Sequence, residues 1–90
     1  MDDFEKYLAE QLENPEFKQE WDSHELEYQI TVKLMRERNA AGLTQVDLAK
    51  RSGIRQSNIS RIEKGETIPT LATLNKLAHG LGKQLQISFV

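Results

Sequence analysis

The sequence contains no cysteine among its 90 residues, so disulfide bonds and thiolate metal sites are excluded. The absence of cysteine fits a reducing cytoplasm, where we expect the protein to be located. No apolar run approaches the ~20 residues that a membrane-spanning helix requires. The chain starts with the acidic stretch Met1-Asp2-Asp3-Phe4-Glu5, which is not a signal peptide. We therefore expect no membrane association.

The chain also lacks the patterns on which enzymes and cofactor sites are built. It has no glycine-rich phosphate loop, and its two histidines, His24 and His79, are 55 residues apart. Ser57 and Ser60 have no histidine nearby in the sequence that could activate them. We therefore expect a protein that is not an enzyme and has no catalytic residues, metal site or cofactor.

Charges of opposite sign are segregated along the chain. Residues 1–29 contain ten acidic and two basic residues, a net charge of −8. Residues 30–90 contain four acidic and ten basic residues, a net charge of +6. A basic domain of this size suits a polyanion such as DNA. The acidic segment cannot bind DNA and needs another explanation.

The first part of the acidic segment has the pattern of an amphipathic helix. Phe4, Tyr7, Leu8 and Leu12 recur at helical spacing and share one face, which predicts a helix over about residues 3–13.

A second short helix is predicted directly afterwards. Asn14 fits its N-cap and Pro15 its first position, where a proline costs no hydrogen bond. Phe17 and Trp21 then lie four residues apart on one face. The capping-box spacing of residues 22–25 opens a third helix that we expect to end near Ala41.

Residues 43–65 contain two short helical patterns on either side of Gly53. Thr44 fits the N-cap of the first helix. Gly53 lies where the chain must turn sharply, and glycine accepts positive φ at little cost. Ile59 and Ile62 share the inner face of the second helix, which begins near residue 55 and has a basic, amide-rich outer face. This arrangement is a helix-turn-helix, whose second helix suits a DNA major groove.

The last part of the chain predicts one more helix and a strand. Thr70 fits the N-cap of a helix whose leucines face inward, and glycines end it. Residues 83–90 alternate polar and apolar side chains through Phe89, which predicts a short β-strand. A lone strand must pair, and a dimer mate or a partner protein is the natural candidate.

The sequence from about residue 30 to residue 81 resembles the Cro/phage-repressor (Xre) class of helix-turn-helix domains. The matching positions are Leu43-Thr44-Gln45, Leu48-Ala49, Gly53, Ile59-Ser60, Glu63, Gly65, Pro69, Leu74 and Leu77-Ala78. The resemblance implies an all-α, Cro/phage-repressor-like fold. Cro-like domains of phage repressors usually place a fifth helix where this chain has its predicted strand, so the dimerisation mode does not transfer.

The resemblance also implies which side chains contact DNA. Arg55, Gln56 and Ser57 would reach base edges from the start of the recognition helix, where arginine pairs with guanine and glutamine with adenine. Arg61 matches a second base-reading position. Considered outside this motif, the same arginine is equally consistent with an ordinary solvated charge on an exposed helix. The implied DNA-binding residues are Gln45, Arg55, Gln56, Ser57, Asn58, Ser60, Arg61 and Lys64.

Some of these residues have a different role in the family. Gln45 matches a residue that contacts the DNA backbone and buttresses the recognition helix, and Lys64 matches a phosphate contact. Asn58 and Ser60 can serve either bases or phosphates. Family members often pair an arginine at the position of Arg38 with the glutamate that matches Glu63, and we expect that ion pair to be structural. 

The acidic segment and the chain's end extend the resemblance to the HigA antitoxins. The arm motifs Phe4-Glu5-Lys6-Tyr7-Leu8 and Asn14-Pro15-Glu16-Phe17-Lys18 and the C-terminal Leu-x-Ile-x-Phe carry this likeness. HigA antitoxins are partners of HigB toxins, RelE-like ribonucleases that cut mRNA at ribosomes. An acidic amphipathic segment complements the basic surface of such a protein. The toxin-binding residues implied are Phe4, Tyr7, Leu8, Leu12, Phe17 and Trp21.

These observations predict three parts. They are an acidic helical arm (residues 1–27), a helix-turn-helix domain (28–82) and a C-terminal strand (83–90). The predicted function is an antitoxin that neutralises a RelE-like toxin, forming a heterotetramer with it. As a homodimer it would also bind an inverted-repeat operator and repress its own operon. The alternatives are a stand-alone Xre regulator whose arm only packs on its own domain, and a protein-binding module that has lost DNA binding.

Overall fold

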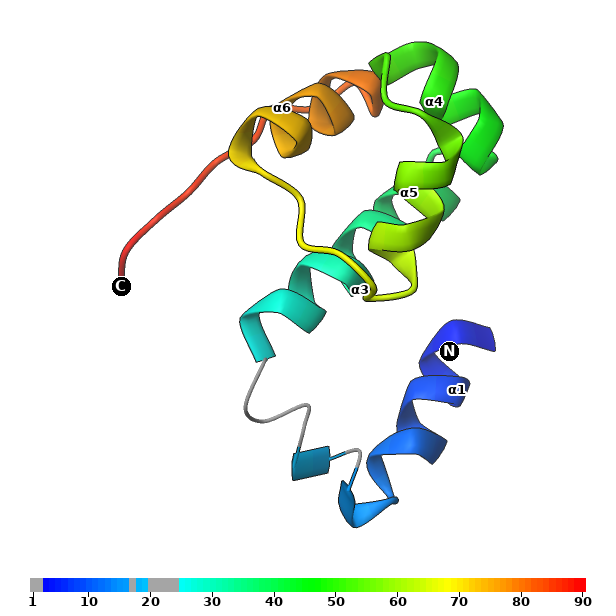
Figure 1. The fold of residues 1–90 in the computed structure, drawn as a ribbon, viewed down its shortest axis with the longest axis vertical. Helices are drawn as coiled ribbons and strands as arrows, with labels where there is room; N and C mark the ends of the chain where they lie inside the picture. Colours follow the sequence, from blue (N-terminus) through cyan, green and yellow to red (C-terminus); the bar gives the residue numbers. More distant parts are fainter. Residues whose placement is uncertain (1–2, 17, 20–24) are drawn as a thin grey trace.

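The computed structural model describes residues 3–16, 18–19 and 25–90. The described part is all-α and contains no strand. Residues 15–16 and 18–19 are helical. The elements with defined bounds are α1 (Asp3–Leu12), α3 (Glu25–Ala40), α4 (Gln45–Ser52), α5 (Gln56–Glu63) and α6 (Leu71–Gly80) (Figure 1). No helix in these residues combines the length and the apolarity that crossing a bilayer requires.

One small apolar core holds the domain together. It consists of Leu34 from α3, Leu48 from α4, Ile59 and Ile62 from α5, and Leu77 from α6. The main helix contacts join α4 to α6, α4 to α5 and α3 to α5, and α1 takes no part in them. Burying each of these side chains stabilises the fold by about 1.5–3 kcal/mol. The fold therefore depends on helices α3 to α6.

Local caps define the ends of α4. The Thr44 hydroxyl accepts a hydrogen bond from the Asp47 amide at 3.0 Å, and the Asp47 carboxylate accepts one from the Thr44 amide at 2.9 Å. This capping box satisfies two donors that the helix cannot pair internally. Gly53 closes the helix with φ 77°, as the sequence predicted, and its amide donates to the Ala49 carbonyl.

Gly80 has a second role that the sequence did not indicate. It lies inside the last turn of α6, where α6 crosses α4. A Cβ atom at this position would lie 2.9 Å from Ser52 Cβ and 3.1 Å from Leu48 Cδ1. Glycine is therefore required here because the two helices approach each other closely.

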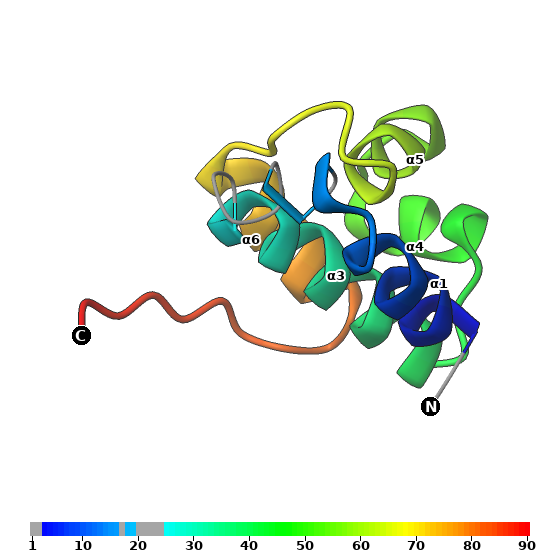
Figure 2. The same cartoon turned by 90° about the horizontal axis from the view of Figure 1, so that it is seen from below.

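The predicted C-terminal strand is wrong for the single chain. Residues 83–90, the C-terminal tail, form neither helix nor strand, and the end of the tail runs away from the helices (Figure 2). Within the described residues, no backbone hydrogen bond involves residues 84–90. A strand exists only through pairing, and the described part of this chain has no second strand to pair with. Ile87 is 62% exposed and Phe89 is fully exposed.

The arm agrees with its sequence pattern where it is described. Helix α1 ends one residue earlier than predicted, at Leu12. The Asn14 side chain accepts a hydrogen bond from the Glu16 amide at 2.9 Å, which is the predicted N-cap contact. The predictions on Phe17, on Trp21 and on the capping box of residues 22–25 lie outside the described residues. Helix α3 extends over Glu25–Ala40, close to its predicted bounds.

Candidate nucleic-acid interface

Helix α5 is held by one face and exposed on the other. Ile59 and Ile62 are fully buried, which fixes the helix against the core. Gln56, Ser57 and Arg61 are exposed on the remaining surface. This division leaves a polar, basic helix face available for a DNA groove.

The turn before α5 sets its direction. After Gly53, the Ile54 amide donates to the Ser52 hydroxyl at 3.1 Å, and the Ile54 side chain packs against the core. Arg55 then takes the N-cap position with extended backbone (φ −62°, ψ 139°) and makes no side-chain cap bond. Its guanidinium is therefore not used for capping, and the residue is exposed beside the first turn of α5.

The structure places the predicted DNA-binding residues in two environments. The exposed group consists of Arg55, Gln56, Ser57, Arg61 and Lys64. Gln45, Asn58 and Ser60 are half-buried. The exposed group therefore forms the outer surface of the candidate interface, with the half-buried residues beneath or beside it.

A hydrogen-bond network runs from the domain interior to this surface. Arg38 Nε donates to Glu63 Oε2 at 2.8 Å and Arg38 Nη2 to Glu63 Oε1 at 2.9 Å. The predicted ion pair is therefore present, with the Glu63 side chain 2% exposed. Arg38 Nη1 also donates to the Leu43 carbonyl at 2.9 Å, which ties α3 to the start of α4.

Two glutamines continue this network. Gln45 Nε2 donates to Glu63 Oε1 at 3.2 Å, and Gln56 Nε2 donates to Gln45 Oε1 at 3.3 Å. The family resemblance predicted that Gln45 buttresses the recognition helix, but it did not predict the hydrogen bond to Glu63. The signal was a buried carboxylate, whose oxygens accept more hydrogen bonds than one arginine fork supplies.

Positive charge gathers around the same two helices. The last turn of α4 carries Lys50 and Arg51, which add to the arginines and the lysine of the exposed group.

The carboxylate of Asp47 on α4 accepts the capping hydrogen bond from the Thr44 amide. The Thr44 backbone amide is the main cause that lowers the pKa of Asp47. Asp47 is therefore ionised at neutral pH, at the N-terminal end of α4.

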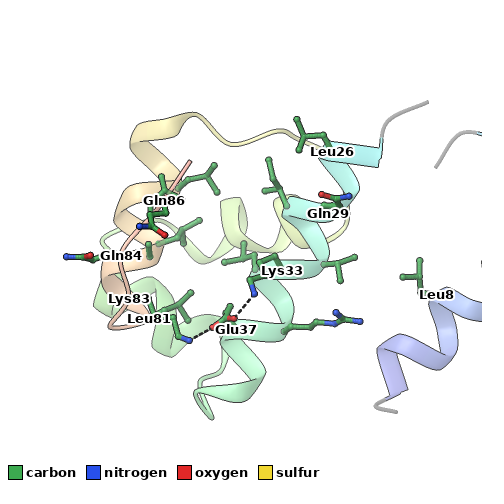
Figure 3. Close-up of a pocket in the computed structure, with 17 residues that line it drawn as sticks. Leu8, Leu26, Gln29, Lys33, Glu37, Leu81, Lys83, Gln84 and Gln86 are labelled. Atoms are coloured by element: carbon green, nitrogen blue, oxygen red, sulfur yellow. Dashed lines mark ion pairs between the residues drawn. The ribbon is translucent and has the colours of Figure 1, made fainter. Parts of the chain in front are cut away.

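An open groove of about 820 Å3 lies on another surface, between α3, α6 and the tail (Figure 3). Apolar side chains such as Leu26, Ile30 and Leu74 line it. At its rim Glu37 accepts from Lys83 at 2.8 Å and from Lys33 at 3.2 Å. Hydrogen bonds from Lys83 and then Lys33 lower the pKa of Glu37. 

The arm presents part of its predicted binding stripe to solvent. Tyr7 is 56% exposed, and Leu8 and Leu12 are half-buried. In the described part of the arm, Leu8 of α1 and Leu26 reach the groove lining. The Phe4 side chain, Phe17 and Trp21 lie outside the described residues. The hypothesis that the arm packs Phe17 and Trp21 on its own domain therefore concerns residues that the structure does not describe.

Comparisons with known proteins agree with this geometry. A family model described as helix-turn-helix matches residues 34–87, more than half of the chain. An uncharacterised HTH-type transcriptional regulator of Haemophilus influenzae is 48% identical over 54 residues, covering 60% of this chain and 55% of that protein. The antitoxin HigA1 of Mycobacterium tuberculosis is 34% identical over 87 residues, covering 96% of this chain and 58% of that protein.

The chain spans a little over half the length of these two relatives. No solved structure matches the chain significantly.

Proposed function

We propose, from the premise that this chain belongs to the helix-turn-helix family of DNA-binding regulators, that it is an antitoxin of the HigA type. The family is one of regulators rather than enzymes. In this proposal, a homodimer binds an inverted-repeat operator and represses its own operon. The arm binds and neutralises a RelE-like, mRNA-cleaving toxin, giving a heterotetramer.

The observation that carries the DNA-binding part is the exposed face of α5. Arg55, Gln56 and Arg61 are exposed on a short helix whose opposite face is anchored by buried isoleucines. Such a helix enters the major groove without rearranging the core, and its arginine and amide groups match base edges. These retained side chains argue against a protein-binding module that has lost DNA binding.

The toxin-binding part is assigned to residues 1–27. This segment carries the net charge of −8, and α1 stands outside the contacts that hold the domain together. The match to the mycobacterial antitoxin covers 96% of the chain, so it extends over much of the arm as well as the helix-turn-helix. Apolar anchors with surrounding carboxylates suit the basic surface of an RNA-cutting enzyme.

We assign the tail to the dimer contact. Within the described residues the backbone of residues 84–90 is unpaired, and the alternating Ile87 and Phe89 leave large apolar surfaces exposed, whereas Leu85 is half-buried. An antiparallel pair of tails related by a two-fold axis would satisfy both backbones and cover these side chains. A two-fold protein is also what an inverted-repeat operator requires.

The second candidate is a stand-alone transcriptional regulator. The Haemophilus influenzae relative favours it, because its 48% identity is confined to 54 residues and it is described only as a regulator. In that case the arm would serve as scaffold for its own domain. 

Co-expression with the product of the neighbouring reading frame separates the two functions. If the neighbour encodes a small, basic, RelE-like protein, the tagged chain should retain it through purification and should restore growth of cells that produce it. Purification of the chain alone, with no rescue of growth, would support the stand-alone regulator. Operator binding by the purified chain is expected under either function.

A further inference from the structure

We infer that Glu37 is a positioning residue for the tail: by holding Lys83 against α3, its carboxylate turns the apolar side of the tail toward the groove and fixes how two copies of the chain pair. The inference rests on the proposed function, because it concerns the dimer formed by two tails. The groove between α3 and α6 is the surface along which the tail leaves the domain (Figure 3). The partner that this surface serves is therefore a second copy of the chain.

The backbone of the tail is fixed only at its first residue. Gly82 leaves α6 with a positive φ of 74°, and its amide donates to the His79 carbonyl at 3.0 Å. The Lys83 amide then donates to the Ala78 carbonyl at 2.9 Å. Within the described residues, the backbone of residues 84–90 makes no hydrogen bond. Beyond Lys83, the direction of the tail therefore depends on side-chain contacts.

Glu37 makes the first of these contacts. Lys83 Nζ lies 2.8 Å from Glu37 Oε2, and Lys33 Nζ lies 3.2 Å from Glu37 Oε1, so each oxygen binds a different lysine (Figure 3). The glutamate side chain is 21% exposed and that of Lys83 is 59% exposed, so the carboxylate is the better fixed partner. Hydrogen bonds from Lys83 and then Lys33 lower the pKa of Glu37, which keeps it ionised at neutral pH. The main helix contacts do not include α3 with α6, so the Lys83–Glu37 ion pair bridges these helices at one end of the groove.

The alternation of the tail determines what this ion pair orients. In an extended segment, every second side chain lies on the same side, so Lys83 shares its side with Leu85, Ile87 and Phe89. Leu85 is half-buried and lines the groove, whereas the glutamines before and after it are exposed. The contact of Lys83 with α3 thus directs the apolar side of the tail toward the domain. A tail rotated by half a turn at Lys83 would present its polar side there instead.

This orientation has a consequence for the dimer. Side chains directly opposite each other in an antiparallel pair of strands lie on the same face of the pair. With Lys83 held in each copy, the apolar side chains of both tails face the two domains rather than water. The two copies of α5 then have one fixed separation, which half-sites at a defined spacing require. Without the ion pair, rotation after Gly82 would allow several arrangements of the two domains.

The test is a charge reversal at Glu37 in the full chain. E37K places a like charge opposite Lys83, and sedimentation equilibrium gives the Kd of the dimer. An exposed ion pair contributes about 1.5- to 5-fold to an equilibrium constant, and the dimer contains two, so Kd should rise about 2- to 30-fold. This difference should disappear near 1 M salt, where the screening length is about 3 Å. Selection from DNA with variable half-site spacing should give one spacing for the wild type and several for E37K.

Three further variants separate positioning from stability. The double variant E37K/K83E recreates the ion pair with its signs exchanged, so it should restore both the wild-type Kd and the single spacing. K83E alone should reproduce E37K, and it tests the ion pair even if E37K is poorly folded, because Lys83 is largely exposed. K33A is the matched control, since it removes the other lysine on Glu37 and should stay close to the wild type. All four should keep the wild-type unfolding temperature, because the core residues are untouched.

The outcomes distinguish this inference from the proposed function. Wild-type Kd and spacing in both E37K and K83E would overturn the role of Glu37, and so would a defect that the exchanged pair fails to repair. If F89D dissociates the dimer while the charge variants leave it unchanged, the tail forms the dimer contact but Glu37 does not position it. A dimer that survives F89D would instead remove the proposed pairing of the tails, and the inference with it.

Discussion

Arg38 and Glu63, 25 positions apart in the sequence, form a two-pronged ion pair in the interior of the domain. The arginine side chain is 14% exposed and the glutamate 2% exposed, so neither charge is well hydrated. The pair joins α3 to the end of α5, the helix that we propose to face DNA. The contribution of this ion pair to the stability of the domain is therefore best measured by removing one partner.

Replacing Arg38 with methionine should lower the free energy of unfolding by about 3–5 kcal/mol, because Glu63 would remain buried without its counter-charge. Urea denaturation of the wild-type and variant chains measures this loss. The double variant R38M/E63L should be less destabilised than R38M alone, since it leaves no buried charge. Equal stability of R38M and the wild type would show that the ion pair is not structural.

Arg55 and Gln56 should dominate operator binding. Replacing either by alanine should cost about 1–3 kcal/mol of binding free energy and relax base preference at the contacted position. K76A is the matched control, because Lys76 is an exposed lysine on α6 that is not among the predicted DNA-binding residues. Gel-shift titrations at several salt concentrations test this, and wild-type affinity should fall steeply with salt. Equal binding to operator and random DNA would contradict sequence-specific recognition.

The tail should control the oligomeric state. F89D places a charge on the apolar face proposed to pair across the dimer, so we expect a shift from dimer to monomer and weaker operator binding. S88D is the matched control, because the alternation puts Ser88 on the opposite face of an extended segment. Size-exclusion chromatography with light scattering gives the mass directly. A dimeric F89D protein would show that dimerisation uses another surface.

Removing residues 1–23 should separate the two proposed activities. The core lies within α3 to α6, so the shortened chain should fold and bind operator DNA. It should lose most of its affinity for the toxin and fail to rescue growth. If it neutralises the toxin as well as the full chain does, the toxin-binding surface lies on the domain or the tail.

Within the arm, apolar anchors should matter more than single carboxylates. Y7A should weaken toxin binding more than E10Q, because aromatic anchors dominate such interfaces whereas exposed charges act mainly on association rate. Surface plasmon resonance at low and high salt measures both effects. E10Q should mainly slow association at low salt. A larger loss of affinity in E10Q than in Y7A would contradict this ranking.

The Asp47 carboxylate should make part of the domain's stability depend on pH. Its folded-state pKa is lowered by the Thr44 amide, whereas the unfolded value is about 3.9. The stabilisation is therefore complete above the unfolded value and is lost as pH falls through the folded value. D47N should melt below the wild type at neutral pH, and this difference should shrink below about pH 3.9. A constant difference in thermal scans would assign the effect to something other than ionisation.

Several features of this protein follow from local sequence. The caps at Thr44 and Thr70, the turn at Gly53 and the buried pair Ile59 and Ile62 were all predictable. Each depends on a few neighbouring residues, through a side chain that reaches a nearby amide or through helical spacing. The helix-turn-helix resemblance likewise rests on positions within one short stretch, and the family match confirms it.

The tertiary structure decided the features that depend on residues far apart in the chain. The bond from Gln45 to Glu63 and the need for glycine at position 80 arise only where α4 crosses α5 and α6. The tail is the opposite case, because its local sequence predicts an element that the tertiary structure does not contain. Its alternating polar and apolar side chains favour a strand, but strand pairing needs a second backbone, and no other described part of this chain provides one. Local periodicity determined the helices, whereas the distances between helices determined which side chains form the interior of the candidate site.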